Sequence, residues 1–473
     1  MSGLNRLTAV QLQGQIIRRE ISPVDLMTDC IAEIEAQNPH INAVVTDNFE
    51  LATELAQNAE AQVLAGAPLG PLHGLPVLVK DLADTKGLRT TYGSKCFANH
   101  VPSADAIVVE KLKSAGAIVI AKTNTPEFGA GANTTNAVFG VTRNPYDTKL
   151  TSGGSSGGSA AGLACDMAPL AVGSDLGGSL RIPASFCSVV GMRPSPGMVP
   201  SKSHVCGFSP LWTDGPMART VEDLALMLSA ISGFDTRDPL SSPASQLSLD
   251  GMRNALDLTA LKLGFSADLG VALVDNDIRS VFESRKPLLT RQFQTATELN
   301  LNMSAATETF KTLRAESMFA TFGDLVAQKA DLIGSNVVQN VQDAQSYSLM
   351  DTAKANASHT QIYRAFQNIF DEVDVLICPA TAVSPFRVEQ NHPETINGQT
   401  LDSYYAWYAI TWALSLTGCP IATIPCGADH NGMPFGIQIV GRRYGDLEVL
   451  KVAQALEAAL NAAGQGRVLR AEA

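Results

Sequence analysis

Short apolar runs alternate with amphipathic stretches along this chain, a pattern that predicts both strands and helices. The runs typical of buried strands lie at 75–79, 116–120, 168–172, 373–378, 421–425 and 436–441. Amphipathic or alanine-rich stretches predict helices over 49–65, 105–115, 160–165, 401–416 and 446–463. Helices interleaved with strands in this order are typical of a crossover α/β arrangement.

Capping signals mark the starts of two further helices. Ser22-Pro23-Val24-Asp25 combines an N-cap serine, a proline at the first helical position and an acid in the first turn. We expect the helix that follows to end before Pro39. Thr220-Val221-Glu222-Asp223 begins another capped helix in the same way.

Charge and composition exclude several classes of protein. The formal net charge is −12, and the 34 Lys and Arg residues are scattered, so we expect neither nucleic acid nor an anionic membrane as a partner. No apolar run is long enough to span a bilayer, and residues 1–20 lack the pattern of a signal peptide. Eight cysteines without a CxxC pair predict free thiols in a reducing compartment. We therefore expect a cytoplasmic protein.

Two glycine- and serine-rich segments, 151–159 and 173–181, suggest serine chemistry. In Gly177-Gly178-Ser179 the glycines let backbone N–H groups converge beside a serine, as an oxyanion hole requires. Residues 153–157 match the nucleophile-elbow pattern G-x-S-x-G, but the polar residues before them do not predict the strand which that motif needs. An α/β-hydrolase that uses Ser155 with a histidine is therefore the weaker alternative.

A nucleophilic serine needs a base, and Lys80 is the candidate. None of the seven histidines lies in a motif that suggests a catalytic triad. A buried lysine can lose its charge, because burial disfavours the ammonium form. Lys80 directly follows the apolar run 75–79. On this pattern alone, a lysine that ends a strand at the protein surface is the favoured interpretation.

Taken together, these segments resemble the amidase signature family. The similar motifs are Gly74–Asp81, Gly153–Ser159 and Gly173–Pro183, and Ser155 and Ser179 stand 24 positions apart, as in that family. Further similar blocks are 122–129, 144–147, 191–194 and 434–441. The resemblance covers nearly the whole chain.

The resemblance implies a catalytic set of three residues. Ser179 is then the nucleophile, Ser155 relays the proton from a cis peptide after Gly154, and a neutral Lys80 is the base. The oxyanion hole is implied to consist of the backbone N–H groups of Leu176, Gly177, Gly178 and Ser179. From the charges alone we add that Asp175 and Arg181 brace this loop, although two such charges could also form a solvated pair.

The resemblance also implies the fold, a single α/β domain with a mixed, twisted central β-sheet sandwiched by helices. Within it we expect a helical N-terminal lead (1–68), the catalytic core (69–240), a mostly helical insertion (241–370) that shapes the substrate entrance, and the C-terminal part of the sheet with its helices (371–473). No zinc, P-loop or other cofactor motif is present, so we expect no metal and no cofactor. A small-molecule amide is the expected partner, and a homodimer stays open.

Two functions within that family have to be distinguished. The chain is either a stand-alone amidase or the glutamine-hydrolysing subunit of a tRNA-dependent amidotransferase, and glutamine would need charged partners. Residues 404–412 are rich in aromatics and hold no acid. If they line the pocket, with Tyr408, Trp412 and Gly154 in contact with substrate, an apolar or aromatic amide is favoured. Core packing of this segment is the alternative, and a catalytically silent binding protein is the alternative outside the enzymes.

Overall fold

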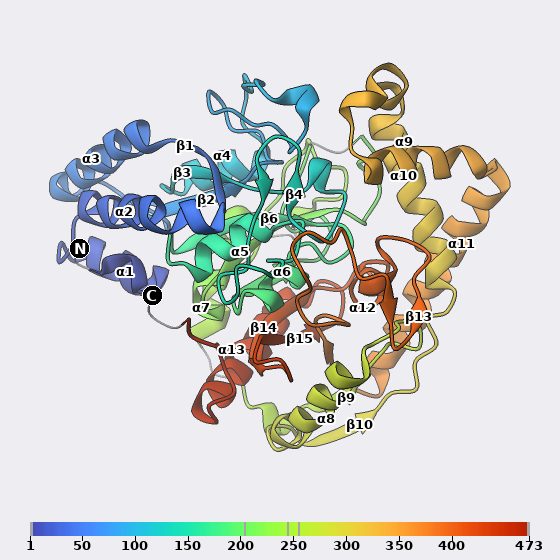
Figure 1. The fold of residues 1–473 in the computed structure, drawn as a ribbon. Helices are drawn as coiled ribbons and strands as arrows, with labels where there is room; N and C mark the ends of the chain where they lie inside the picture. The colour runs from blue at the N-terminus through green and yellow to red at the C-terminus, as the bar shows by residue number, and fades with distance from the viewer. Residues whose placement is uncertain (1–2, 203–204, 244–245, 254–255, 471–473) are drawn as a thin grey trace.

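A single 11-stranded sheet runs through the centre of the protein in the computed structural model (Figure 1). The structure describes residues 3–202, 205–243, 246–253 and 256–470. In spatial order the strands are β1 (Val44–Asp47), β3 (Ile118–Thr123), β2 (Pro76–Lys80), β6 (Leu170–Asp175), β8 (Thr213–Ala218), β7 (Val190–Arg193), β14 (Ile421–Ala428), β15 (Pro434–Val440), β11 (Val375–Pro379), β9 (Lys262–Phe265) and β10 (Thr295–Glu298). Two small hairpins, β4 (Thr135–Asn136) with β5 (Gly140–Val141) and β12 (Thr395–Ile396) with β13 (Gln399–Thr400), lie outside the sheet.

The sheet is mixed. Strand β2 pairs in parallel with β3 and β6, and β9 pairs in parallel with β10 and β11. The strands between these two groups pair antiparallel. The predicted fold class, one α/β domain with a mixed sheet flanked by helices, is confirmed.

Helices flank the sheet (Figure 1). Their bounds are α1 (Ala9–Ile17), α2 (Pro23–Ile41), α3 (Phe49–Ala65), α4 (Ile107–Ser114), α5 (Gly157–Ala164), α6 (Arg181–Phe186), α7 (Val221–Ile231), α8 (Asn276–Thr290), α9 (Ala306–Lys329), α10 (Ser335–Ser346), α11 (Leu349–Asn368), α12 (Ala409–Ser415) and α13 (Asp446–Ala462). Helices α10 and α11 both pack on α9. Among the helices of the described ranges, none is long and apolar enough to cross a membrane.

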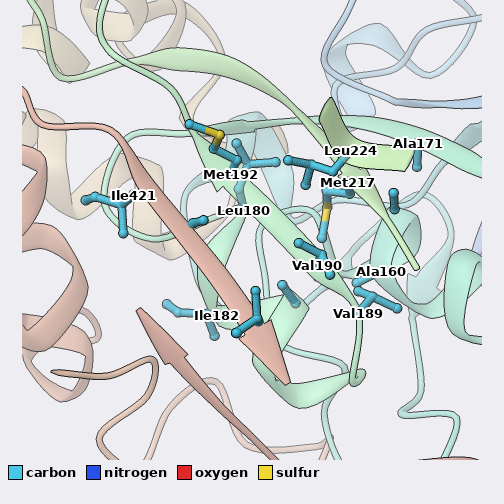
Figure 2. Packing of buried hydrophobic residues seen from close by; sticks show 14 of the residues in the cluster. Ala160, Ala171, Leu180, Ile182, Val189, Val190, Met192, Met217, Leu224 and Ile421 are labelled. Carbon is cyan, nitrogen blue, oxygen red and sulfur yellow. The ribbon is translucent and has the colours of Figure 1, made fainter. Parts of the chain in front are cut away.

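The main core lies where the middle strands meet the helices α5, α6 and α7. Figure 2 shows Leu180 and Ile182 packed among Met192, Met217 and Ile421. Leu180 and Ile182 are the residues directly before and after Arg181 in the sequence. All five side chains are at most 1% exposed. The turn that carries Ser179 is therefore anchored in the buried core of the molecule.

Several sequence-based boundaries were wrong. Helix α2 continues past Pro39 to Ile41 and ends at Asn42, whose left-handed backbone still donates its N–H to the Asn38 carbonyl. The predicted helix over 401–416 is a true α-helix only from Ala409, since the residues before it form turns and a 3-10 segment. Strands β1, β7 and β8 were not predicted at all.

The segment 241–370 is not a purely helical insertion, because it contributes β9 and β10 to the main sheet. Each of these strands has four residues, and β10 buries none of its side chains fully. Strand β9 (Lys-Leu-Gly-Phe) is too short to show a periodic pattern, and β10 is in addition polar, which is why the two strands were missed. The helices α8, α9, α10 and α11 do make up more than half of the rest of this segment, which agrees with the expected mostly helical character.

Candidate active site

Lys80 is the last residue of β2, and its side chain is 1% exposed. Its Nζ lies 2.6 Å from Ser155 Oγ, 3.0 Å from Ser156 Oγ and 3.1 Å from Ser174 Oγ. Strands β2 and β6 are parallel neighbours, so their carboxyl ends lie at the same edge of the sheet and bring Lys80 beside Ser174. The interpretation of Lys80 as a surface lysine is wrong.

Burial lowers the pKa of Lys80 to about 7 from an ordinary value of 10.5. The carboxylates of Asp175 and Asp214 act in the opposite direction, because they favour the ammonium form, but burial outweighs them. A large fraction of the amine is therefore neutral near pH 7 and able to accept a proton.

Ser155 lies in the turn that leads into α5, and the Gly154–Ser155 peptide bond is cis, as the resemblance implied. The neighbouring strand β6 makes room for this turn at Gly173, where a Cβ atom would lie only 2.5 Å from Ser156 Oγ. A glycine is needed there for Lys80 to reach the two consecutive serine hydroxyls.

Ser179 lies in the turn between β6 and α6. Its side chain is partly exposed and lines the same cavity as Lys80 and Ser155. The Ser156 N–H donates to the Ser179 carbonyl over 3.2 Å, which ties the two glycine- and serine-rich segments together. The structure thus brings the three predicted catalytic side chains into one site.

The backbone of this turn offers free N–H donors. The amides of Leu176, Gly177 and Ser179 form no hydrogen bond with any residue that the structure describes. Gly178 differs from the prediction, because its N–H donates to Asp175 Oδ1 over 2.9 Å. The geometry therefore leaves three of the four predicted amides available for an oxyanion.

Asp175 and Arg181 brace the turn through charged hydrogen bonds. The carboxylate accepts from Arg181 Nε at 3.0 Å and Nη2 at 2.9 Å, and from the Leu180 N–H at 3.0 Å. Both side chains are fully buried, so the solvated-pair alternative is wrong. Burial alone would raise the pKa of Asp175, but the guanidinium groups of Arg181 and Arg193 hold it well below its ordinary value. The carboxylate is therefore charged throughout the neutral range.

The serines and Lys80 open into a cavity of about 760 Å³. Aromatic and apolar side chains line it, among them Tyr92, Phe97, Phe128, Trp212, Met318 and Phe322. Two of these, Phe128 and Phe322, are in ring contact at 4.4 Å and belong to a second apolar cluster between the segment 92–130 and the helices α9 and α10. Helix α9 thus supplies one wall of the cavity.

The three predicted substrate contacts Tyr408, Trp412 and Gly154 do not line this cavity. Trp412 is buried, stacks on Phe310 at 4.8 Å and donates its Nε1–H to the Tyr405 carbonyl. Tyr408 and Trp412 lie behind the Ser179 turn, against Gly177. The prediction that the 404–412 segment lines the pocket is wrong, because tertiary contacts with α9 turn these rings into the core.

Sequence reasoning missed four contributors to the site. Ser156 and Ser174 contact Lys80 directly, and Asp214 lines the cavity near the start of β8, opposite Ser174 in the strand register. Strand β8 contains Gly215-Pro216, a pair typical of turns, so the strand was not predicted and Asp214 could not be placed beside Ser174. The cavity-lining face of α9, which includes Arg314, could have been predicted as one face of a helix, since its residues recur at helical spacing.

No histidine among the described residues lines the cavity. Two that are partly or fully buried are engaged elsewhere, His73 with the Ala59 carbonyl and His359 with the Leu416 carbonyl. The alternative of an α/β-hydrolase with a serine–histidine pair finds no support in this geometry.

The chain is similar to known proteins over nearly all of its length. A model of the amidase family matches residues 25–450. An acylamidase of Rhodococcus erythropolis is 32% identical, and a glutamyl-tRNA(Gln) amidotransferase subunit of Natranaerobius thermophilus is 35% identical, with 96% and 98% of both chains covered, respectively. The crystal structure of a bacterial aryl acylamidase matches with a TM-score of 0.89 at 28% identity, covering 96% of each chain. The chain belongs to the amidase signature family and is an amide-hydrolysing enzyme.

Proposed function

We propose that the enzyme cleaves its amide by acyl transfer to Ser179, with Ser155 as proton relay and Lys80 as base. One observation carries this proposal: a lysine that is 1% exposed places its amine 2.6 Å from Ser155 Oγ, in the cavity that Ser179 also lines. A buried amine without a carboxylate in direct contact is suited to act in its neutral form, as a base.

The reaction then has two halves. Lys80 accepts the proton of Ser155, Ser155 takes that of Ser179, and the Ser179 oxygen attacks the amide carbonyl. The proton returns along the same path to the leaving nitrogen as the C–N bond breaks, which releases ammonia or an amine and leaves an acyl ester on Ser179. Water, deprotonated by the same relay, attacks the ester and releases the carboxylate.

Charge that develops on the carbonyl oxygen needs donors in place beforehand. The free N–H groups of Leu176, Gly177 and Ser179 supply them, in a turn that Asp175 and Arg181 hold rigid. Such preorganised donors are each worth about 10²- to 10³-fold in rate.

The cavity supports an amide with an apolar or aromatic part as substrate. Phe128, Phe322 and Trp212 provide flat apolar surface there. The names of the acylamidase and aryl acylamidase relatives agree with such a substrate.

A second candidate function is glutamine hydrolysis within a tRNA-dependent amidotransferase, which the 35% identity to a component of such an enzyme favours. The aromatics of the 404–412 segment do not count against it, since they are core residues. A panel of glutamine, short aliphatic amides, anilides and urea-type substrates separates the two functions. Glutaminase activity that appears only with a partner protein would select the amidotransferase.

Replacement of the nucleophile tests the mechanism. Ser179→Ala should lose turnover by several orders of magnitude, and Lys80→Ala should lower it by orders of magnitude as well. Wild-type protein should be labelled at Ser179 by a fluorophosphonate, and Ser179→Ala should not.

Ser159→Ala is the matched control. Ser159 belongs to the same serine-rich segment as Ser155, but its hydroxyl contacts Thr123 and the Val172 carbonyl instead of Lys80. Wild-type turnover in Ser179→Ala would overturn the mechanism, and absence of labelling in the wild type would favour a silent binding protein.

Cytoplasmic location remains a proposal, which the eight free cysteines support. A homodimer is likewise a proposal, and the molecular mass in solution measures it directly.

A further inference from the structure

Arg314 is a buried cation in the wall of the active-site cavity. It lies on α9, is 5% exposed and lines the same cavity as Ser179. No carboxylate among the described residues forms an ion pair with it, in contrast to Arg181. A guanidinium taken out of water without an anion is costly, so its retention needs an explanation.

Neutral groups hold this guanidinium in one orientation. Nε donates to Asn340 Oδ1 over 3.0 Å, and Nη2 donates to the Tyr404 hydroxyl. Asn340 Nδ2 also donates to the Tyr404 hydroxyl, over 2.7 Å, and the rings of Tyr404 and Tyr405 both lie 5.6 Å from the guanidinium carbon. The side chain is therefore fixed on its inner side, without its charge being neutralised.

The third nitrogen, Nη1, forms no hydrogen bond with any residue in the described part of the chain. It is also absent from the set of fully buried polar atoms that lack a hydrogen bond, so part of its surface is exposed. Nη1 is thus accessible, in a residue that lines the cavity. A guanidinium with a free edge suits a carboxylate better than any neutral group.

The position of Arg314 along α9 relates it to the nucleophile. Phe310, one helical turn earlier, packs against the Ser179 turn, where a Cβ on Gly177 would lie 3.3 Å from Phe310 Cζ. The next α9 residues that line the cavity are Arg314, Ser317 and Met318, and the lining continues to Gln328. Arg314 is therefore the first cavity-lining residue of α9 after Phe310, about 6 Å further along the helix axis.

We propose that Arg314 binds a carboxylate of the substrate, so that the enzyme prefers amides that carry a free carboxylate a short chain away from the scissile carbonyl. Monoamides of dicarboxylic acids are the simplest members of this class. The aromatic wall then accommodates the rest of the substrate, and the inference rests on the proposed serine mechanism for the cleavage itself.

The experiment compares charged with neutral amides of equal length. Wild-type kcat/KM is measured for succinamic, glutaramic and adipamic acids and for butyramide, valeramide and hexanamide. We expect the acids to be preferred, and Arg314→Met to lower kcat/KM for the best acid roughly 10- to 100-fold, mainly through KM, while the neutral amide changes less than about threefold. Arg314→Lys should recover part of the loss for the acids. Lys329→Met, which removes an exposed charge from the same helix outside the cavity, is the control.

Two further measurements separate binding from structural damage. Glutarate should inhibit neutral-amide hydrolysis competitively in the wild type and about tenfold more weakly in Arg314→Met. Fluorophosphonate labelling of Ser179 should proceed equally fast in both proteins. Equal losses for charged and neutral amides, or no preference for the acids in the wild type, would overturn the role of Arg314 alone. Failure of Ser179 labelling would instead overturn the proposed mechanism.

Discussion

At the scale of single residues, the central feature is a buried amine whose surroundings lower its pKa. Burial drives the pKa of Lys80 down to about 7, while the charges of Asp175 and Asp214 limit the shift. Burial also raises the pKa of Asp214 to about 6, so this carboxyl is charged above that pH and acts on Lys80 over the range in which the lysine titrates. The pH dependence of the enzyme should therefore report the balance between the two groups.

We expect kcat/KM to fall on the acid side with a midpoint near pH 7, since only neutral Lys80 can accept a proton and it is neutral above its pKa. Asp214→Asn removes a charge that favours the ammonium form, so the midpoint should move to lower pH. The measurement is a profile of kcat/KM from pH 5 to 10 for both proteins. A flat profile across this range would exclude a lysine base.

At the scale of elements, helix α12 positions the turn that carries Ser179, the proposed nucleophile. Thr411 Oγ1 donates to the Gly177 carbonyl over 2.7 Å. Gly178 has φ +134°, and a Cβ atom there would lie 2.3 Å from Thr411 Oγ1. Both the backbone conformation and the close contact require glycine. The position of Ser179 thus depends on an element more than 200 residues further along the chain.

Gly178→Ala should displace this turn and lower kcat about 100-fold, since a small displacement of the reacting groups lowers the reaction rate strongly. The overlap with Thr411 should also cost about 1–3 kcal/mol of unfolding free energy. Gly432→Ala is the matched control, because Gly432 has φ +75° with nothing within 4 Å of the added Cβ. It should lose about 1 kcal/mol and keep its activity. Steady-state kinetics and urea denaturation of both variants provide the comparison, and an unimpaired Gly178→Ala enzyme would contradict a role of this glycine in seating the turn.

At the scale of the whole molecule, Arg181 connects the turn that carries Ser179 to the C-terminal part of the chain. Beyond Asp175, its guanidinium donates to the Thr411 carbonyl, Ser415 Oγ and Gln438 Oε1. Its hydrogen bonds therefore join the Ser179 turn to α12 and β15. The catalytic turn and the C-terminal part of the sheet should consequently unfold together.

Arg181→Met should cost about 3–5 kcal/mol of unfolding free energy, because it leaves the fully buried Asp175 carboxylate with too few partners. Arg237→Met is the control on the surface. Arg237 also pairs with carboxylates, Glu110 and Asp235, but is 41% exposed, so its loss should cost about 0–1 kcal/mol. Urea denaturation measures both. Equal losses in the two variants would show that burial does not control the strength of this pair.

Sequence patterns were most informative where chemistry and backbone conformation are local. The strand ahead of Lys80, the capped helix after Thr220 and the two glycine- and serine-rich turns all lie where they were predicted. The polar edge strand β10 and the Gly-Pro-containing strand β8 escaped detection, since each is recognisable only by its pairing with a distant neighbour.

By itself, the sequence indicated the family and the α/β class and, through the family resemblance, the proposed roles of Lys80, Ser155 and Ser179, because the family's motifs are runs of residue types that can be read along the chain. Only the tertiary structure decided that Tyr408 and Trp412 face the core, that Gly178 donates its N–H to Asp175, and that Arg314 lines the cavity without an anionic partner among the described residues. The physical reason is that periodicity shows which face of a helix is apolar, whereas neighbours from remote parts of the chain decide whether that face meets packed side chains or an open cavity.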